Sequence, residues 1–159
     1  MIDPRHLAVL RTIAGRLDNS GVNWVVTGSL GFALQGVPVD VHDIDIQTDA
    51  AGAYAIERCF AGFSVRKVTF SAAERIRSHF GALVIDGIRV EIMGDIQKRL
   101  ADGTWEDPVD LSRHKRFVNV EGMRVPVLSL EYECQAYEKL GRMDKVALLR
   151  QWLNAPDKA

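Results

Sequence analysis

The sequence has no apolar stretch that approaches the ~20 residues needed to cross a bilayer. Residues 1–11 also lack the apolar core of a signal peptide, so we expect a cytoplasmic protein that does not contact membranes. Neither sign of charge is in excess, because 20 Lys and Arg residues stand against 21 Asp and Glu residues and the net charge is -1. Proteins that bind nucleic acids generally carry a basic excess, so general nucleic-acid binding is unexpected, although a local basic pocket is not excluded.

Cysteine is scarce as well, with only Cys59 and Cys134 in the sequence. Both stand in segments with helical patterning and make no metal-type spacing, which predicts reduced, buried thiols. The sequence contains no Walker loop, no zinc-type spacing and no Ser-His-Asp order. Its 159 residues show no internal repeat, low-complexity tract or long linker, so we expect one domain spanning residues 1–159.

Hydrophobic periodicity and turn residues predict the order of the secondary-structure elements. Asp3-Pro4 and Asp49 are typical of helix N-termini, and Asp86-Gly87 between two apolar runs is a strong hairpin signal. Residues 94–114 are polar and are expected to be mostly loop. Helices are predicted at 4–17, 30–35, 50–60 and 129–154 (broken at Gly141), and strands at 24–26, 44–48, 82–85, 88–92 and in a hairpin over 116–127. This order predicts an α+β, α/β-like fold in which helices flank a mixed sheet, with a C-terminal helical segment.

The most informative stretch is VTGSLGFALQGVPVDVHDIDIQTD, residues 26–49. Within it, Gly28-Ser29 joins a predicted buried strand to a predicted helix. Glycine permits a tight turn and the close approach of a ligand. The free N–H groups at the start of a helix, together with the Ser29 hydroxyl, suit phosphate groups. A Gly-Ser pair alone usually marks an ordinary turn, so the prediction depends on the acidic residues further along the stretch.

These acidic residues come after the turn at strand spacing. Asp43 and Asp45 are two apart on a predicted strand, so their carboxylates share one face while Ile44 and Ile46 face the core. Glu91 lies on the predicted strand 88–92. If that strand neighbours the first, three carboxylates converge. Asp95, just beyond the strand, is a rival for the third position, and we prefer Glu91.

Three convergent carboxylates beside a phosphate-binding turn suit a magnesium site. Mg²⁺ prefers oxygen ligands and commonly shares its coordination shell with substrate phosphates. Two such ions, about 3.5–4 Å apart, can bind the attacking and leaving oxygens of an in-line displacement at phosphorus. Without a cation the same carboxylates would repel one another.

Gly28-Ser29 followed by Asp43-Ile44-Asp45 resembles the signature of the polymerase-beta-like nucleotidyltransferase superfamily, in particular its small bacterial members such as lincosamide and other antibiotic nucleotidyltransferases. The resemblance is tight over residues 24–49 and loose over most of the chain. It implies that Gly28 and Ser29 hold nucleotide phosphates, and that Asp43, Asp45 and Glu91 bind two Mg²⁺ ions and form the catalytic site. Lys139, in the last helices, could reach the phosphates or could belong to a solvated helix face.

The implied function is Mg²⁺-dependent transfer of a nucleoside monophosphate from a nucleoside triphosphate, such as ATP, to a hydroxyl of a small molecule or a protein. The sequence offers no large separate acceptor domain. We therefore expect the C-terminal helices or a second copy in a homodimer to complete the acceptor side. The alternative is a non-catalytic module on the same fold that binds a nucleotide or a protein, for example within a toxin–antitoxin pair.

Overall fold

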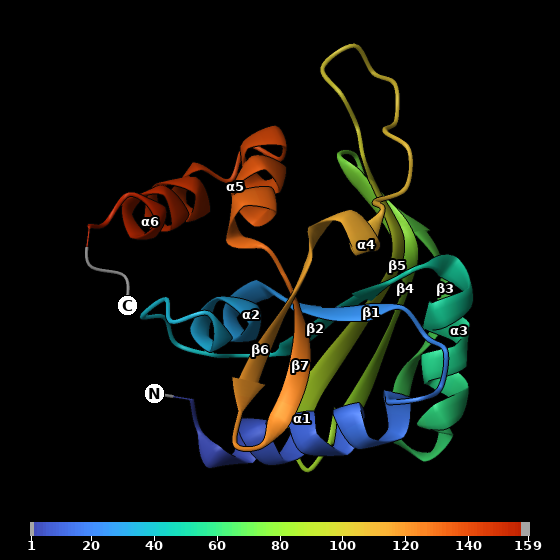
Figure 1. Cartoon of the computed structure of the whole chain (residues 1–159). Helices are drawn as coiled ribbons and strands as arrows, with labels where there is room; N and C mark the ends of the chain where they lie inside the picture. Colours follow the sequence, from blue (N-terminus) through green and yellow to red (C-terminus); the bar gives the residue numbers. More distant parts are fainter. Residues whose placement is uncertain (1, 157–159) are drawn as a thin grey trace.

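The computed structural model describes residues 2–156, which form one mixed sheet with helices packed on both of its faces (Figure 1). The helices are α1 (Pro4–Leu17), α2 (Gly28–Leu34), α3 (Ala50–Cys59), the 3-10 helix η1 (Ala61–Phe63), α4 (Leu111–His114), α5 (Leu130–Lys139) and α6 (Met143–Leu153). The strands are β1 (Trp24–Thr27), β2 (Ile44–Thr48), β3 (Ser64–Ala72), β4 (Ile76–Ile85), β5 (Ile88–Lys98), β6 (Lys115–Val120) and β7 (Met123–Leu128).

The sheet has seven strands in the order β3-β4-β5-β2-β1-β7-β6. β2 and β5 are parallel, as are β1 and β7, whereas the remaining neighbours are antiparallel. The mixed sheet flanked by helices, predicted from the order of elements, is confirmed. The pairing of β2 with β5 matters most for the site, because it places the two acid-bearing strands side by side.

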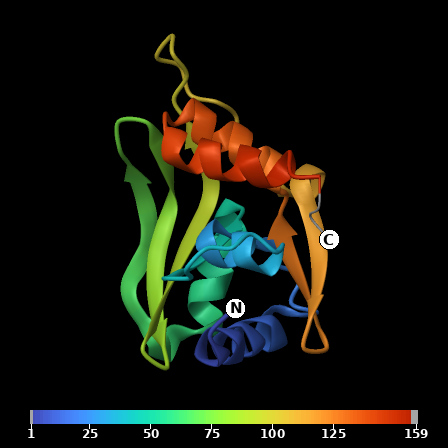
Figure 2. The ribbon, with the colours of Figure 1, turned by 90° about the vertical axis from the view of Figure 1, so that its left-hand side faces the viewer.

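The two faces of the sheet have different partners. Ile44, Ile46, Val90 and Ile92 point to the face covered by α1 and α3, where they belong to the main apolar core. Side chains alternate along a strand, so the residues between them lie on the other face. That second face is covered by α5, and a separate apolar cluster joins α5 to α2 and α6. Figure 2 shows α2 between α1 below and the α5–α6 pair above.

Local signals in the sequence predict most of the element boundaries correctly. The carboxylates of Asp3 and Asp49 accept backbone N–H bonds at the starts of α1 and α3, and the Ser129 hydroxyl does the same at the start of α5. The β4–β5 hairpin turns at Asp86-Gly87, where both residues have positive φ angles of 50° and 80°. Gly141, with φ 74°, separates α5 from α6 as predicted.

Two expectations from the sequence are wrong, and one strand is not predicted at all. β3 is a strand that the pattern does not reveal, because its residues are mostly exposed. β5 continues to Lys98, although the sequence predicts mostly loop over residues 94–114. Cys134 is buried, but Cys59 is exposed, because Phe60, which directly follows α3, takes the next buried position after Ile56. Among residues 2–156, no helix is long and apolar enough to cross a membrane.

Candidate active site

The turn from β1 into α2 contains a glycine, Gly28, that no other residue can replace without moving neighbouring atoms. Gly28 has a φ of 68°, in the left-handed region that disfavours other residues. A Cβ atom added there would overlap the Oδ2 atom of Asp45. The next residue, Ser29, accepts a hydrogen bond from the His42 backbone N–H at 3.2 Å, which ties the turn to the loop before β2. The turn therefore brings the backbone directly against the Asp45 carboxylate.

The predicted carboxylates are brought together by the parallel pairing of two strands. Asp45 on β2 stands directly opposite Glu91 on β5, and both point to the face away from the main core. Burial raises the pKa of Asp45 from 3.8 to about 7, and the negative charges of Glu91 and then Asp43 contribute to that rise. Glu91, and Asp43 just before β2, are thus close enough to Asp45 to oppose its ionisation.

Glu91 and its rival Asp95 have different surroundings. The Glu91 carboxylate accepts a hydrogen bond from the Arg89 Nε–H at 3.0 Å, an ion pair along one strand. Asp95 has a positive φ of 51° and lies where the β4–β5 register shifts, so it belongs to a β-bulge. Neither Glu91 nor Asp95 lines the cavity beside Asp45, but Glu91 stands opposite Asp45 and is among the groups that raise its pKa, whereas Asp95 is not. This placement favours Glu91 as the third carboxylate.

A cavity of about 150 Å³ lies between the sheet and α5, and Gly28 and Asp45 line one part of its wall. Met93, Ile96 and Lys98 extend its wall along β5 to the end of that strand, because the bulge at Asp95 shifts the alternation of side chains. Its lining residues are Thr27, Gly28, Asp45, Gln47, Ile76, Met93, Ile96, Lys98, Leu128, Tyr132, Glu133, Ala136, Tyr137 and Leu140.

Lys139 is not brought to this cavity. Its side chain is half exposed, and its ammonium group pairs with the Glu106 carboxylate at 2.6 Å. The cation in the cavity wall is instead Lys98, whose side chain is 4% exposed. Its Nζ atom lies 3.1 Å from the Tyr132 hydroxyl and 3.5 Å from the Glu106 carboxylate. Burial lowers the pKa of Lys98, against the opposing effect of Glu106.

Glu133 on α5 is a further acidic side chain beside Asp45, and the sequence motifs do not single it out. It is 3% exposed and accepts a hydrogen bond from the Thr27 hydroxyl, while its Oε2 atom has no partner among the described residues. Burial raises the pKa of Glu133 to about 8, partly offset by bonds from Thr27 and the Gly28 N–H. Its spacing from Leu130 and Tyr137 places it on the inner stripe of α5, the signal that could have identified it.

The carboxylates of the site suit a divalent cation whose remaining ligands come from water and substrate phosphates. Within residues 2–156, no group of three or more His, Cys, Asp or Glu side chains is gathered closely enough to hold a metal ion alone. Mg²⁺, however, is commonly bound by one or two carboxylates together with waters and phosphates. A buried carboxylate such as Asp45, whose ionisation is opposed by its neighbours, would be relieved by a cation. Asp43 and Asp45 are the residues that would hold it, with Glu91 beside them.

Comparison with known proteins agrees with this architecture. The model of the family described as aminoglycoside-2''-adenylyltransferase matches residues 9–148. The Thermotoga maritima protein TM1012, a provisionally assigned nucleotidyltransferase of known structure, is 69% identical to the chain. That alignment covers 97% of this chain and 96% of TM1012, with a TM-score of 0.87. Among curated proteins, no sequence matches the chain.

Two antibiotic-modifying enzymes share the fold at low identity. The lincosamide adenylyltransferase LnuA, solved with lincomycin, is 13% identical, with a TM-score of 0.57 and coverage of 94% of this chain and 97% of LnuA. ANT(2")-Ia, solved with adenylyl-2"-tobramycin, is 10% identical, with a TM-score of 0.62 and coverage of 94% of this chain and 90% of that enzyme. At these identities the likeness shows the fold alone.

Proposed function

Because the chain belongs to the aminoglycoside-2''-adenylyltransferase family and has a nucleotidyltransferase fold, we propose that it transfers a nucleoside monophosphate from a nucleoside triphosphate to a hydroxyl group of an acceptor. ATP is the proposed donor and Mg²⁺ the proposed metal. A cytoplasmic location and a single-domain organisation remain part of this proposal.

One observation carries the proposal: Asp45 and Glu91 stand opposite each other on parallel strands, with the Gly28 backbone against the Asp45 carboxylate. A phosphate bound at the turn would therefore lie beside the carboxylates. When bound, Mg²⁺ supplies positive charge that offsets the phosphates and the carboxylates together. The protein's own contribution is to hold these groups in a fixed arrangement that is partly shielded from water.

The residues of the site have separate proposed roles. The Gly28-Ser29 turn holds the β- and γ-phosphates: the Ser29 N–H and hydroxyl groups donate to them, and Gly28, which has no side chain, lets them approach the backbone. Asp43 and Asp45 hold the metal. Glu91 accepts the proton of the acceptor hydroxyl, and its ion pair with Arg89 keeps the carboxylate in place before substrate binds.

The chemical step is a single displacement at the α-phosphorus. The acceptor oxygen forms a bond to that phosphorus, and its proton passes to the Glu91 carboxylate. The bond between the α-phosphorus and the bridging oxygen breaks, and pyrophosphate leaves with the electron pair. Catalysis then rests on positioning and on the stabilisation of charge, as in phosphoryl transfer generally.

The test is incubation of the protein with α-labelled nucleoside triphosphates, Mg²⁺ and a panel of hydroxylated acceptors. We expect labelled product with the parent protein, and loss of product in Asp45→Asn and Glu91→Gln. Asp95→Asn is the matched control, because it removes a carboxylate of the same strand that does not stand opposite Asp45. Equal activity in Glu91→Gln and loss in Asp95→Asn would reverse the assignment of the third carboxylate. Calorimetry should show nucleotide binding that requires Mg²⁺, and equal affinity in EDTA would contradict the metal-bridged site.

A further inference from the structure

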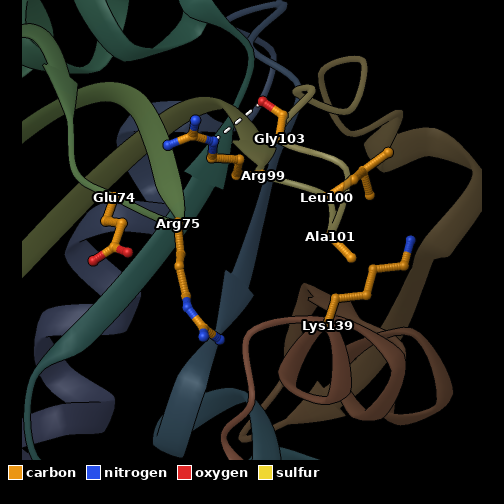
Figure 3. A pocket seen from close by; sticks show the side chains of 7 residues that line it. All are labelled: Glu74, Arg75, Arg99, Leu100, Ala101, Gly103 and Lys139. Carbon is orange, nitrogen blue, oxygen red and sulfur yellow. Dashed lines mark hydrogen bonds between the residues drawn. The ribbon is translucent and has the colours of Figure 1, made fainter.

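A second, larger pocket of about 500 Å³ lies next to the cavity of the candidate active site (Figure 3). It is bordered by the β3–β4 hairpin, by the segment that follows β5, and by the C-terminal end of α5. Each of these three segments contributes one basic side chain. The lining residues are Glu74, Arg75, Arg99, Leu100, Ala101, Gly103 and Lys139.

The positive charge of this pocket is only partly neutralised. Lys139 is paired with Glu106, but neither Arg75 nor Arg99 has a carboxylate partner in the part of the chain that the structure describes. Both guanidinium groups are instead oriented by backbone carbonyls. Arg75 donates to the Leu140 carbonyl at 3.3 Å, and the Arg99 Nε–H donates to the Gly103 carbonyl at 3.1 Å (Figure 3). Each guanidinium keeps further N–H donors, and Glu74 is the single carboxylate in the lining.

The basic pocket adjoins the inner cavity. Ile76, Lys98 and Leu140 line the cavity, and their immediate chain neighbours Arg75, Arg99 and Lys139 line the pocket. The two hollows share no lining residue, but both are lined by residues at the end of β5. Glu91 lies near the start of the same strand, so about 25 Å of extended backbone separates it from Arg99.

We propose that the basic pocket binds an anionic group, a phosphate or a carboxylate, at the far end of an elongated small-molecule acceptor. This inference rests on the proposed nucleotidyltransferase function. In that function the donor triphosphate is held at Gly28 and Ser29, beside Asp45 and Glu91, and not at the end of β5 where Arg99 lies. The guanidinium groups of Arg75 and Arg99 would then bind the second substrate, the acceptor.

The charge of the pocket distinguishes this acceptor from an aminoglycoside such as the tobramycin part of the adenylyl-2"-tobramycin bound to ANT(2")-Ia. An aminoglycoside carries several ammonium groups, which Arg75 and Arg99 would repel. A planar guanidinium matches the geometry of phosphate and carboxylate oxygens. An acceptor with its hydroxyl at one end and an anionic group at the other fits both hollows.

The test is an NMR titration of the full chain with inorganic phosphate at constant ionic strength, followed at the backbone amides of Ala101 and Gly103. We expect saturable shifts in the parent protein. In the double variant Arg75→Gln/Arg99→Gln, phosphate affinity should fall about tenfold or more, as expected when charge-assisted hydrogen bonds are lost. Arg58→Gln is the matched control, because Arg58 is exposed on α3 and lies outside the pocket.

A parallel titration with Mg²⁺–ATP separates the acceptor from the donor. We expect the double variant to bind Mg²⁺–ATP like the parent. An equal loss of phosphate and Mg²⁺–ATP affinity would assign the pocket to the donor and overturn the proposal. Absence of saturable shifts, or the same loss in Arg58→Gln, would also overturn it. If the parent binds phosphate in the pocket but never binds Mg²⁺–ATP, the proposed function fails while the anion site stands.

Discussion

Replacing Asp45 by Asn tests whether the carboxylates are as crowded as the structure indicates. The substitution removes one negative charge from beside Glu91 and Asp43 and nearly preserves the shape of the side chain. An acid with a raised pKa in the folded protein keeps its proton when the unfolded chain has released it. Stability therefore falls as the pH rises from the ordinary pKa of Asp, 3.8, toward the folded value of about 7.

The expected size follows from that shift. Each pKa unit corresponds to about 1.4 kcal/mol, so a rise from 3.8 to about 7 opposes folding by about 4 kcal/mol at neutral pH. Asn still carries the cost of burying a polar group, which reduces the benefit of the substitution. We expect the Asn variant to be about 1–3 kcal/mol more stable than the parent at pH 7 without metal. The difference should shrink toward pH 4.

The assay is urea unfolding of both proteins in EDTA between pH 4 and pH 8, repeated with Mg²⁺ and ATP. Ligand at 100 times its dissociation constant stabilises the folded state by about 2.7 kcal/mol, and the variant should lose most of this effect. Asp95→Asn serves as the matched control for the loss of one negative charge. A variant that is less stable than the parent in EDTA, and that responds to ligand like the parent, would refute the crowded site and favour a structural role for Asp45.

Three further substitutions test other parts of the site. Gly28→Ala should reduce transfer activity about 100-fold, because the added Cβ displaces the Asp45 carboxylate. Gly21→Ala is the control for backbone strain, because Gly21 has a φ of 81° but open space around it, and equal activity in both variants would contradict the clash. Glu133→Gln should make the free energy of unfolding less dependent on pH between about 4.5 and 8, measured by urea titration, and an unchanged dependence would contradict the raised pKa. Arg89→Gln should lower the Mg²⁺ concentration that gives half-maximal transfer, because it removes a positive charge from beside the carboxylates; a higher requirement would contradict this.

The parts of the fold that local chemistry determines could be predicted from the sequence. Turn and capping residues such as Asp49, Asp86-Gly87 and Gly141 fix their own backbone geometry, so the hairpin and the helix limits follow from a few neighbouring side chains. β3 could not be predicted in this way. It is stabilised by pairing with β4, and its own pattern of exposed residues carries no clear strand signal.

The same difference between local signals and long-range pairing applies to the candidate site. The alternation of Asp43, Ile44 and Asp45 predicts a shared face from the strand period alone, but the meeting of Asp45 with Glu91 depends on β2 and β5 being neighbours. That pairing is a long-range contact, so the sequence pattern alone does not show whether the two strands are neighbours. In the structure they are parallel neighbours, and their register places the two acids directly opposite each other.

Lys98 and Glu133 show why the composition of the cavity wall could not be predicted. Charged residues are usually exposed, so the sequence pattern places Lys98 in a polar loop and does not single out Glu133. Each is buried because tertiary structure provides partners: Tyr132 and Glu106 for Lys98, and Thr27 for Glu133. The bulge at Asp95 also shifts the alternation of β5, so that Lys98 lines the same cavity as Met93. The cavity therefore has carboxylates at one end, beside Gly28, and the cation Lys98 at the other, at the end of β5. With Mg²⁺ bound at the carboxylates, both ends would suit negatively charged groups of the substrates. The strand pairing places the carboxylates, and the bulge places Lys98.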